Sequence, residues 1–226
     1  MNDVLIKEKI KSIKDAIPKH VTLVAVSKFQ SIESIKASYE AGHRDFGENY
    51  VQELCNKYEQ LPKDIKWHFI GHLQSNKVKY IAPFVHLIHS VDNLKLLKEI
   101  DKQGSKNNRI INCLIQMYIA QEETKFGCNE DELFNLIKSS ELDTYKHVCI
   151  KGLMGMASFT NNKSQIEKEF KYIRTLFDKI KNTTLKQNID CQILSIGMSG
   201  DYSIAIECGS TLIRIGTSIF GERKNI

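Results

Sequence analysis

The segment Val21-Thr22-Leu23-Val24-Ala25-Val26-Ser27-Lys28 is a β-branched, apolar run that ends in a lysine. A run of this composition is typical of a buried strand in a parallel sheet. Because an ammonium group is costly to bury, a lysine that closes such a strand reaches water, pairs with an acid or serves chemistry. A partly desolvated amine has a lowered pKa and can form a Schiff base with an aldehyde. Lys28 is therefore the first candidate functional residue.

Strand and helix patterns alternate along the chain after an amphipathic helix at residues 4–17. Beyond the first strand, near 21–28, we expect strands at 45–48, 67–70, 85–89, 110–117, 148–154, 192–195 and 212–215. Helical patterns follow the eight strands at 31–42, 51–59, after Gln74, from Asp92, and at 131–139, 163–181 and 202–207, with a short terminal segment last. Eight such units without a low-complexity linker predict an α/β fold: a single (β/α)8 TIM-type barrel with an extra N-terminal helix, forming one domain over residues 1–226. A doubly wound open sheet is the alternative, but no GxGxxG turn follows the first strand.

The composition indicates a protein of ordinary globular type. Hydrophobic residues make up 42% and charged residues 26% of the 226 residues, as in soluble domains. No apolar run is long enough to cross a bilayer, and the N-terminus does not resemble a secretory signal. The six cysteines are scattered without a CxxC pair, which predicts reduced thiols in a cytoplasmic protein rather than a zinc site.

The net charge of +5 raises the question of an anionic partner. The lysines are spread over the expected helices and alternate with acids, which is typical of solvated helix faces. No recognised nucleic-acid-binding module is present, so we expect neither nucleic acid nor membrane as a partner. A small phosphorylated ligand fits the mild positive balance.

Polar residues follow most of the expected strands. In a barrel, functional residues lie at the carboxyl ends of the strands and in the loops that follow them. The segments at these positions begin with Lys28, Glu48-Asn49, His68 with His72, Ser90 to Asp92, Gly155 to Ala157, Gly197 to Asp201, and Arg214 to Thr217. Their shared position on one rim predicts a site there.

The loops after the last two strands have the character of a phosphate-binding site. Small residues let the backbone approach an anion, and N–H groups at a helix start can hold it. Ser199-Gly200 and Gly216-Thr217 occupy these loops, where barrels commonly bind phosphate. The ordinary alternative is that Ser199 and Thr217 are only helix N-caps.

Several longer motifs resemble the YggS/PROSC family, the pyridoxal phosphate (PLP) homeostasis proteins. The matching segments include Phe46-Gly47-Glu48-Asn49-Tyr50-Val51-Gln52-Glu53, Trp67-His68-Phe69-Ile70-Gly71-His72-Leu73-Gln74-Ser75-Asn76-Lys77, Leu194-Ser195-Ile196-Gly197-Met198-Ser199-Gly200-Asp201 and Ile213-Arg214-Ile215-Gly216-Thr217. The resemblance runs in order from about Val21 to Arg223, and the combined set of motifs is specific.

The resemblance implies a barrel like the N-terminal domain of bacterial alanine racemase, PLP fold type III. It implies that Lys28 carries PLP as a Schiff base and that Asn49 lies near the phenolic oxygen of the cofactor. It places Arg214 at the pyridine nitrogen and Met198 close to the ring. The residues that it assigns to the phosphate are Ser199, Gly200, Gly216 and Thr217. Where many relatives have Val-Asn on the fifth strand, this chain has Met117-Tyr118.

Two functions of different classes remain open. The first is a binding protein for intracellular PLP homeostasis that holds the cofactor and can pass it to apo-enzymes, as a monomer or weak dimer. The second is an amino-acid racemase of the alanine racemase type. Racemization needs an acid/base on each face of the ring, and in alanine racemases one of them is a tyrosine from a second domain. The chain ends at Ile226, so we expect no such domain and favour the carrier.

Three further residues could take part in catalysis or in a second contact. A phosphosugar isomerase barrel is a third alternative, and it would need a carboxylate base such as Glu48 or Glu122. Lys125 could contact a second aldehyde, although such a lysine is more often solvated. Lys28 together with Arg214 fits PLP better, because an arginine cannot give up its proton and would leave the pyridine nitrogen unprotonated.

Overall fold

Eight parallel strands form a closed barrel in the computed structural model, which describes residues 3–120, 126–183 and 186–221. Each strand pairs with the next one in the sequence, and the eighth pairs with the first. The strands are β1 (Thr22–Val26), β2 (Asp45–Glu48), β3 (Lys66–Phe69), β4 (Leu87–Val91), β5 (Ile111–Met117), β6 (Val148–Gly155), β7 (Ile189–Ser195) and β8 (Leu212–Ile215).

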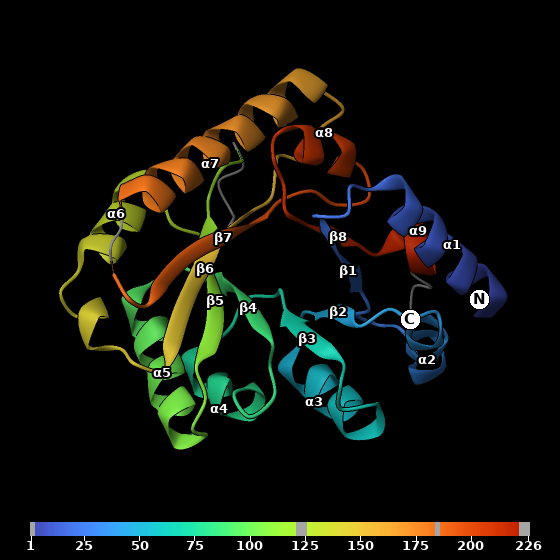
Figure 1. Cartoon of the computed structure of the whole chain (residues 1–226), viewed down its shortest axis with the longest axis horizontal. Coiled ribbons are helices and arrows are strands. Elements are labelled where there is room, and N and C mark those ends of the chain that lie inside the picture. Colours follow the sequence, from blue (N-terminus) through green and yellow to red (C-terminus); the bar gives the residue numbers. More distant parts are fainter. Residues whose placement is uncertain (1–2, 121–125, 184–185, 222–226) are drawn as a thin grey trace.

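Helices surround this barrel on the outside (Figure 1). They are α1 (Asp3–Ala16), α2 (Ile32–Glu40), α3 (Val51–Gln60), α4 (Val78–Ile81), α5 (Leu94–Lys106), α6 (Glu130–Lys138), α7 (Lys163–Thr183), α8 (Tyr202–Glu207) and α9 (Thr217–Phe220), with short 3-10 turns at Ser75–Lys77 and Leu142–Thr144. The extra helix α1 buries Ile6 and Ile10 and packs beside α2 and α9. The predicted barrel and its N-terminal helix are confirmed.

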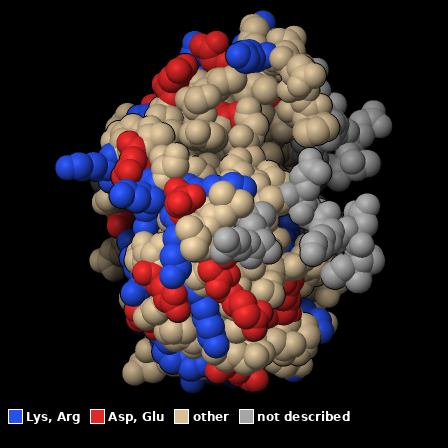
Figure 2. Space-filling view, turned by 90° about the vertical axis from the view of Figure 1, so that its right-hand side faces the viewer, with Lys and Arg blue, Asp and Glu red and all other residues tan. Residues whose placement is uncertain are grey.

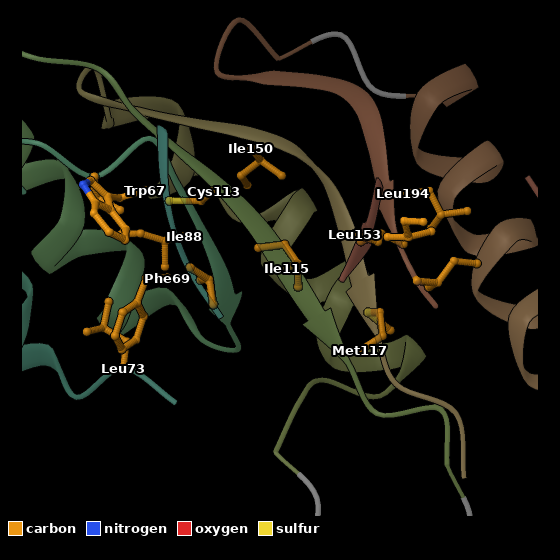
Figure 3. Close-up of a cluster of buried hydrophobic side chains, with 14 of the residues drawn as sticks. Trp67, Phe69, Leu73, Ile88, Cys113, Ile115, Met117, Ile150, Leu153 and Leu194 are labelled. Atoms are coloured by element: carbon orange, nitrogen blue, oxygen red, sulfur yellow. The ribbon is translucent and has the colours of Figure 1, made fainter. Parts of the chain in front are cut away.

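The main hydrophobic core lies between the strands and the helices. Successive side chains of a strand point to opposite faces, and on β3 the flanking residues Trp67 and Phe69 point outward into this core. Figure 3 shows them with Ile88, Ile115 and other apolar side chains of the neighbouring strands. His68, between Trp67 and Phe69, therefore points into the barrel.

The interior of the barrel holds a second, smaller apolar cluster. It is formed by Val24, Leu87, Leu114, Met154 and Leu212, which are 0 to 3% exposed. Other inward positions are polar and equally buried, namely those of His68, His89, Ser195 and Arg214. A barrel interior is normally filled by branched apolar side chains, so these polar residues require a reason.

The element bounds differ from the sequence predictions at a few places. The fourth strand runs from Leu87 to Val91 rather than over 85–89, and β7 begins three residues before the predicted 192. Asp92 does not begin the following helix, because Asn93 is its N-cap and accepts the Leu96 N–H at 2.8 Å. Ser31 is the N-cap of α2, and its side chain accepts the Ser34 N–H.

Figure 2 shows the face that carries α1 and α2, which lies at the right of Figure 1. Charges of both signs are interspersed on this face. Lys7 of α1, for example, pairs with Glu40 of α2 at 2.7 Å. No helix in the described part of the chain combines the length and apolar character that crossing a bilayer would need.

Candidate functional site

The structure brings the predicted site residues to one end of the barrel. Because the strands are parallel and the barrel is closed, all carboxyl ends of the strands meet at the same rim. Lys28 and Asn49 follow β1 and β2, which are neighbours, and Gly216 follows β8, which pairs with β1 on its other side. Met198, Ser199 and Gly200 follow β7, the strand next to β8.

Lys28 lies in a tight turn directly after β1. The Gln30 N–H donates to the Ser27 carbonyl at 3.0 Å, and Phe29 has a φ of 63°. A left-handed conformation is uncommon for a residue other than glycine and costs of the order of 1–3 kcal/mol. The Glu53 carboxylate accepts the Phe29 N–H at 2.6 Å and so stabilises this conformation. The half-buried Lys28 is thus presented by a turn that α3 holds in place.

A buried cluster of charged groups lies beneath this turn. The Lys57 ammonium, on a side chain that is 6% exposed, donates to the Ser27 carbonyl at 2.7 Å, to Glu48 Oε1 at 2.8 Å and to Glu53 Oε1 at 2.6 Å. The Ser27 hydroxyl also donates to Glu48 Oε1, at 2.5 Å. Burial raises the pKa of Glu48 to about 7, although Lys57 lowers it. The cluster fixes the end of β1 and therefore the position from which Lys28 extends.

Arg214 is held rigidly inside the barrel near the rim. Its Nη1 donates to the carbonyl and the hydroxyl of Ser195 at 2.7 and 2.5 Å, and its Nη2 donates to the Gly155 carbonyl at 3.0 Å. Burial lowers the pKa of Arg214 to about 10, against the opposing effect of Asp201. At neutral pH the group is therefore a fixed cation that can only donate hydrogen bonds.

The loop after β7 is built around a buried aspartate. Asp201 Oδ1 accepts the Met198 N–H at 2.5 Å, and the Tyr202 N–H donates to the Met198 carbonyl at 2.9 Å. Gly197 has a φ of +96°, and a Cβ there would lie 2.6 Å from the Cβ of Ala205, so glycine is required. This turn fixes the backbone of Ser199 and Gly200.

Neither Ser199 nor Thr217 is a helix N-cap, so the ordinary alternative for these residues is wrong. The N-cap positions of α8 and α9 are Asp201 and Gly216, and neither makes a side-chain cap hydrogen bond. Beside Gly200, a Cβ would meet nothing within 4 Å, which leaves room for a ligand to approach the backbone. In α8 the first N–H, that of Tyr202, donates to the Met198 carbonyl, but no side-chain cap satisfies the first N–H groups of α9, which can serve an anion.

His68 and His72, the two histidines expected at the end of the third strand, have different surroundings. His68 is buried and bonded to His89 and Asp45, at 3.0 and 3.2 Å, while His72 stacks on Phe126 with the ring centroids 4.1 Å apart. Asp45, His68 and His86 offer ligand atoms within 4.8 Å of one another, but Asp45 and His68 already bond to each other. Glu122 and Lys125 lie outside the described residues.

Sequence reasoning missed Lys57, Ser195 and His89. A signal existed for Lys57, because it follows the buried Leu54 by three residues on α3 and so shares its inward face. Ser195 and His89 gave no signal, because a strand buried on both faces does not show which side chains point inward.

Known proteins resemble the whole chain. A model of the family "Alanine racemase, N-terminal domain" matches residues 5–224. The pyridoxal phosphate homeostasis protein of Haemophilus influenzae is 40% identical over 207 residues, or 90% of this chain and 86% of that protein. The one of Helicobacter pylori is 40% identical over 220 residues, or 95% and 94%.

Solved structures agree with this relationship. PipY of Synechococcus elongatus, solved with PLP bound, superimposes with a TM-score of 0.86 at 32% identity, over 96% of this chain and 100% of its own. An alanine racemase of Clostridium difficile has a TM-score of 0.75 at 12% identity, over 97% of this chain and 57% of its own, so that likeness concerns the fold alone. The chain belongs to the family of pyridoxal phosphate homeostasis proteins, which shares its fold with the N-terminal domain of alanine racemase.

Proposed function

We propose that this chain binds PLP at the rim of the barrel and serves intracellular PLP homeostasis. The observation that carries the proposal is the presence of Lys28 and Arg214 at the same end of the barrel. Lys28 extends from a turn that the buried Lys57 cluster holds, and Arg214 is locked by Ser195 and Gly155. The relatives named for PLP homeostasis and the PLP-bound PipY structure support it.

The residues of the rim fit the chemistry of the cofactor. PLP supplies, when bound, an aldehyde that a lysine amine can capture and a ring that withdraws electrons. Lys28 would hold the aldehyde carbon, Asn49 would donate to the phenolic oxygen, and Met198 would pack on the ring. The phosphate would be held by the backbone and side chains of Ser199, Gly200, Gly216 and Thr217.

Arg214 limits which reactions the bound cofactor can support. With a pKa of about 10 it stays protonated at neutral pH and presents only donors to the ring nitrogen. A ring nitrogen that accepts a hydrogen bond but gains no proton is a weak electron sink, which disfavours transamination. We propose that the protein keeps PLP available for apo-enzymes in the cytoplasm, as a monomer or weak dimer. The six free cysteines are consistent with a reducing compartment.

The experiment that tests this function is intact and peptide mass spectrometry after incubation with PLP and borohydride reduction. We expect one phosphopyridoxyl group, located on Lys28 and absent from the Lys28→Ala variant. Lys95→Ala, which removes an exposed lysine of α5, should keep the adduct. No adduct, or adducts scattered over surface lysines, would refute PLP binding at this site, and amino-acid turnover by the loaded protein would refute the carrier role.

A further inference from the structure

A line of buried polar side chains crosses the interior of the barrel from Arg214 to its opposite end. Ser195 Oγ, which accepts from Arg214, lies 3.1 Å from His89 Nδ1. His89 Nε2 lies 3.0 Å from His68 Nδ1, and His68 Nε2 lies 3.2 Å from Asp45 Oδ1. The five residues come from β8, β7, β4, β3 and β2, and Asp45 is the first residue of β2, at the amino end of the barrel.

The direction of the hydrogen bonds along this line is fixed by its two ends. Arg214 has only donors, so its bond to Ser195 leaves the hydroxyl hydrogen of Ser195 for His89 Nδ1. A neutral His89 then carries its hydrogen on Nε2 and donates it to His68 Nδ1. His68 in turn donates from Nε2 to Asp45, which as a carboxylate has only acceptors. With both imidazoles neutral, this is the one assignment that satisfies every bond of the line.

Burial keeps His89, in the middle of the line, neutral, and the groups at the two ends of the line are charged. Burial, His68 and Arg214 hold the pKa of His89 well below its usual value, and burial with His68 lowers that of the neighbouring His86 to about 4. Burial alone would raise the pKa of Asp45, but the hydrogen bond from His68 and the charge of Lys66 bring it below its usual value. Other titratable groups also act on this end: Lys14, beside Arg44, and His43 interact with Asp45, and Arg109 opposes protonation of His86.

Arg214 has five N–H groups, and the contacts to Ser195 and Gly155 use three of them. One N–H on Nη2 and the N–H on Nε have no partner among the described residues. Ser195 helps to decide which groups remain, because its hydroxyl oxygen accepts one N–H of Arg214 while its hydrogen is available to His89 Nδ1. The state of His89 depends in turn on His68 and Asp45.

We propose that Ser195, His89, His68 and Asp45 are positioning residues that aim the remaining N–H groups of Arg214 at the ring nitrogen of the bound cofactor. The inference rests on the proposed function. Its consequence is long-range: a change at Asp45, whose side chain is 19% exposed at the far end of the barrel, alters the environment of the ring without touching it. Hydrogen-bonded chains in a low-dielectric interior polarise one another, which provides the coupling.

The first test uses the protein without PLP. Nitrogen-15 NMR of the imidazoles reports which ring nitrogen carries the hydrogen, and we expect neutral rings with the hydrogen on Nε2 for both His68 and His89 at pH 7. Asp45→Ala should release the preference of His68, while Asp45→Asn, which keeps an acceptor oxygen, should retain it. A hydrogen on Nδ1 of either ring in the unmodified protein would overturn the inference.

The second test uses the PLP-loaded protein. In Asp45→Ala we expect an altered absorbance spectrum and pH profile of bound PLP and a dissociation constant raised roughly threefold to tenfold, the size of one net hydrogen bond. Asp45→Asn should restore all three. Asp190→Ala is the matched control, because Asp190 also lies at the amino end of a strand but pairs with Lys151 instead.

The two proposals fail in different ways. If the unmodified protein forms no adduct on Lys28, the proposed function fails, whatever the NMR shows. If the adduct forms and Asp45→Ala matches Asp190→Ala in spectrum, pH profile and affinity, the positioning role is wrong. Ser195→Ala, a small change within the barrel, provides a second variant if Asp45→Ala does not fold, and it should shift the same three measurements.

Discussion

Replacing Lys57 by methionine should destabilise the protein in a manner that depends on pH. Methionine matches the length of lysine but removes the ammonium, which donates to Ser27, Glu48 and Glu53. Glu48 is fully buried, so the variant leaves a carboxylate without its counter-charge in the interior. Breaking a buried ion pair by removing one partner typically costs about 3–5 kcal/mol. We expect a loss of that size at pH 8, where Glu48 is ionised in the unmodified protein.

At pH 5 the loss of stability caused by Lys57→Met should be smaller than at pH 8, because the folded variant then holds a proton on Glu48. The pKa of Glu48 is already raised to about 7 by burial, and Lys57 is the group that lowers it. Without Lys57 the folded-state pKa rises further, so the folded protein binds a proton that the unfolded chain has released. Stability therefore falls as pH rises above the unfolded pKa, by up to about 1.4 kcal/mol per pH unit for one group, until the folded pKa is reached.

Urea unfolding followed by the fluorescence of Trp67 measures this effect. Trp67 is the single tryptophan and is fully buried in the core, so its emission reports on the folded barrel. The double variant Lys57→Met/Glu48→Gln is the control, since it removes both charges and should recover part of the stability at pH 8. Equal losses at pH 5 and pH 8, or no recovery in the double variant, would refute the assignment of Glu48 as a buried charge that depends on Lys57.

Three other predictions follow from the same geometry. Glu48→Gln should make the stability of the protein less dependent on pH between pH 4.5 and 7. A carboxyl whose pKa is raised in the folded state makes the protein less stable as pH rises through that window, and glutamine removes this effect. Urea midpoints at several pH values measure the dependence, and an unchanged slope would contradict the prediction. Gly197→Ala should destabilise the protein by about 1–3 kcal/mol and weaken its retention of PLP, because φ is +96° and the new Cβ would lie 2.6 Å from the Cβ of Ala205. Thermal unfolding and equilibrium dialysis test these two effects. The comparison is Gly42→Ala, which strains φ but brings the new Cβ within 4 Å of no other atom. Arg214→Gln should raise the dissociation constant for PLP by roughly tenfold or more, the size of a lost charged hydrogen bond. The phosphopyridoxyl group found after borohydride reduction should stay on Lys28. Unchanged affinity in a fluorescence titration would exclude a contact between Arg214 and the cofactor.

Much of the fold could be predicted from local patterns. The run from Val21 to Val26 is mostly apolar and β-branched because most of the strand is buried, and eight strand patterns with helices between them leave few alternatives to a barrel. Element ends were less certain: Asn93 rather than Asp92 caps α5, and both residue types are equally good N-caps, so only the backbone geometry decides. Similarly, Ser199 and Thr217 were open to a capping role that the structure excludes.

The sequence by itself determined the order of the strands and, through the parallel arrangement, the rim on which Lys28, Asn49 and Gly216 gather. Only the tertiary structure decided what these groups depend on. Lys57 reaches Ser27 across 30 residues of sequence, and His89 bonds to Ser195 across 106. Such partners follow from the tilt and closure of the barrel, which set which inward side chains face one another. Side chains alternate between the two faces of a strand, so alternate residues share a face. When both faces are buried, the sequence does not tell which of them lines the interior of the barrel.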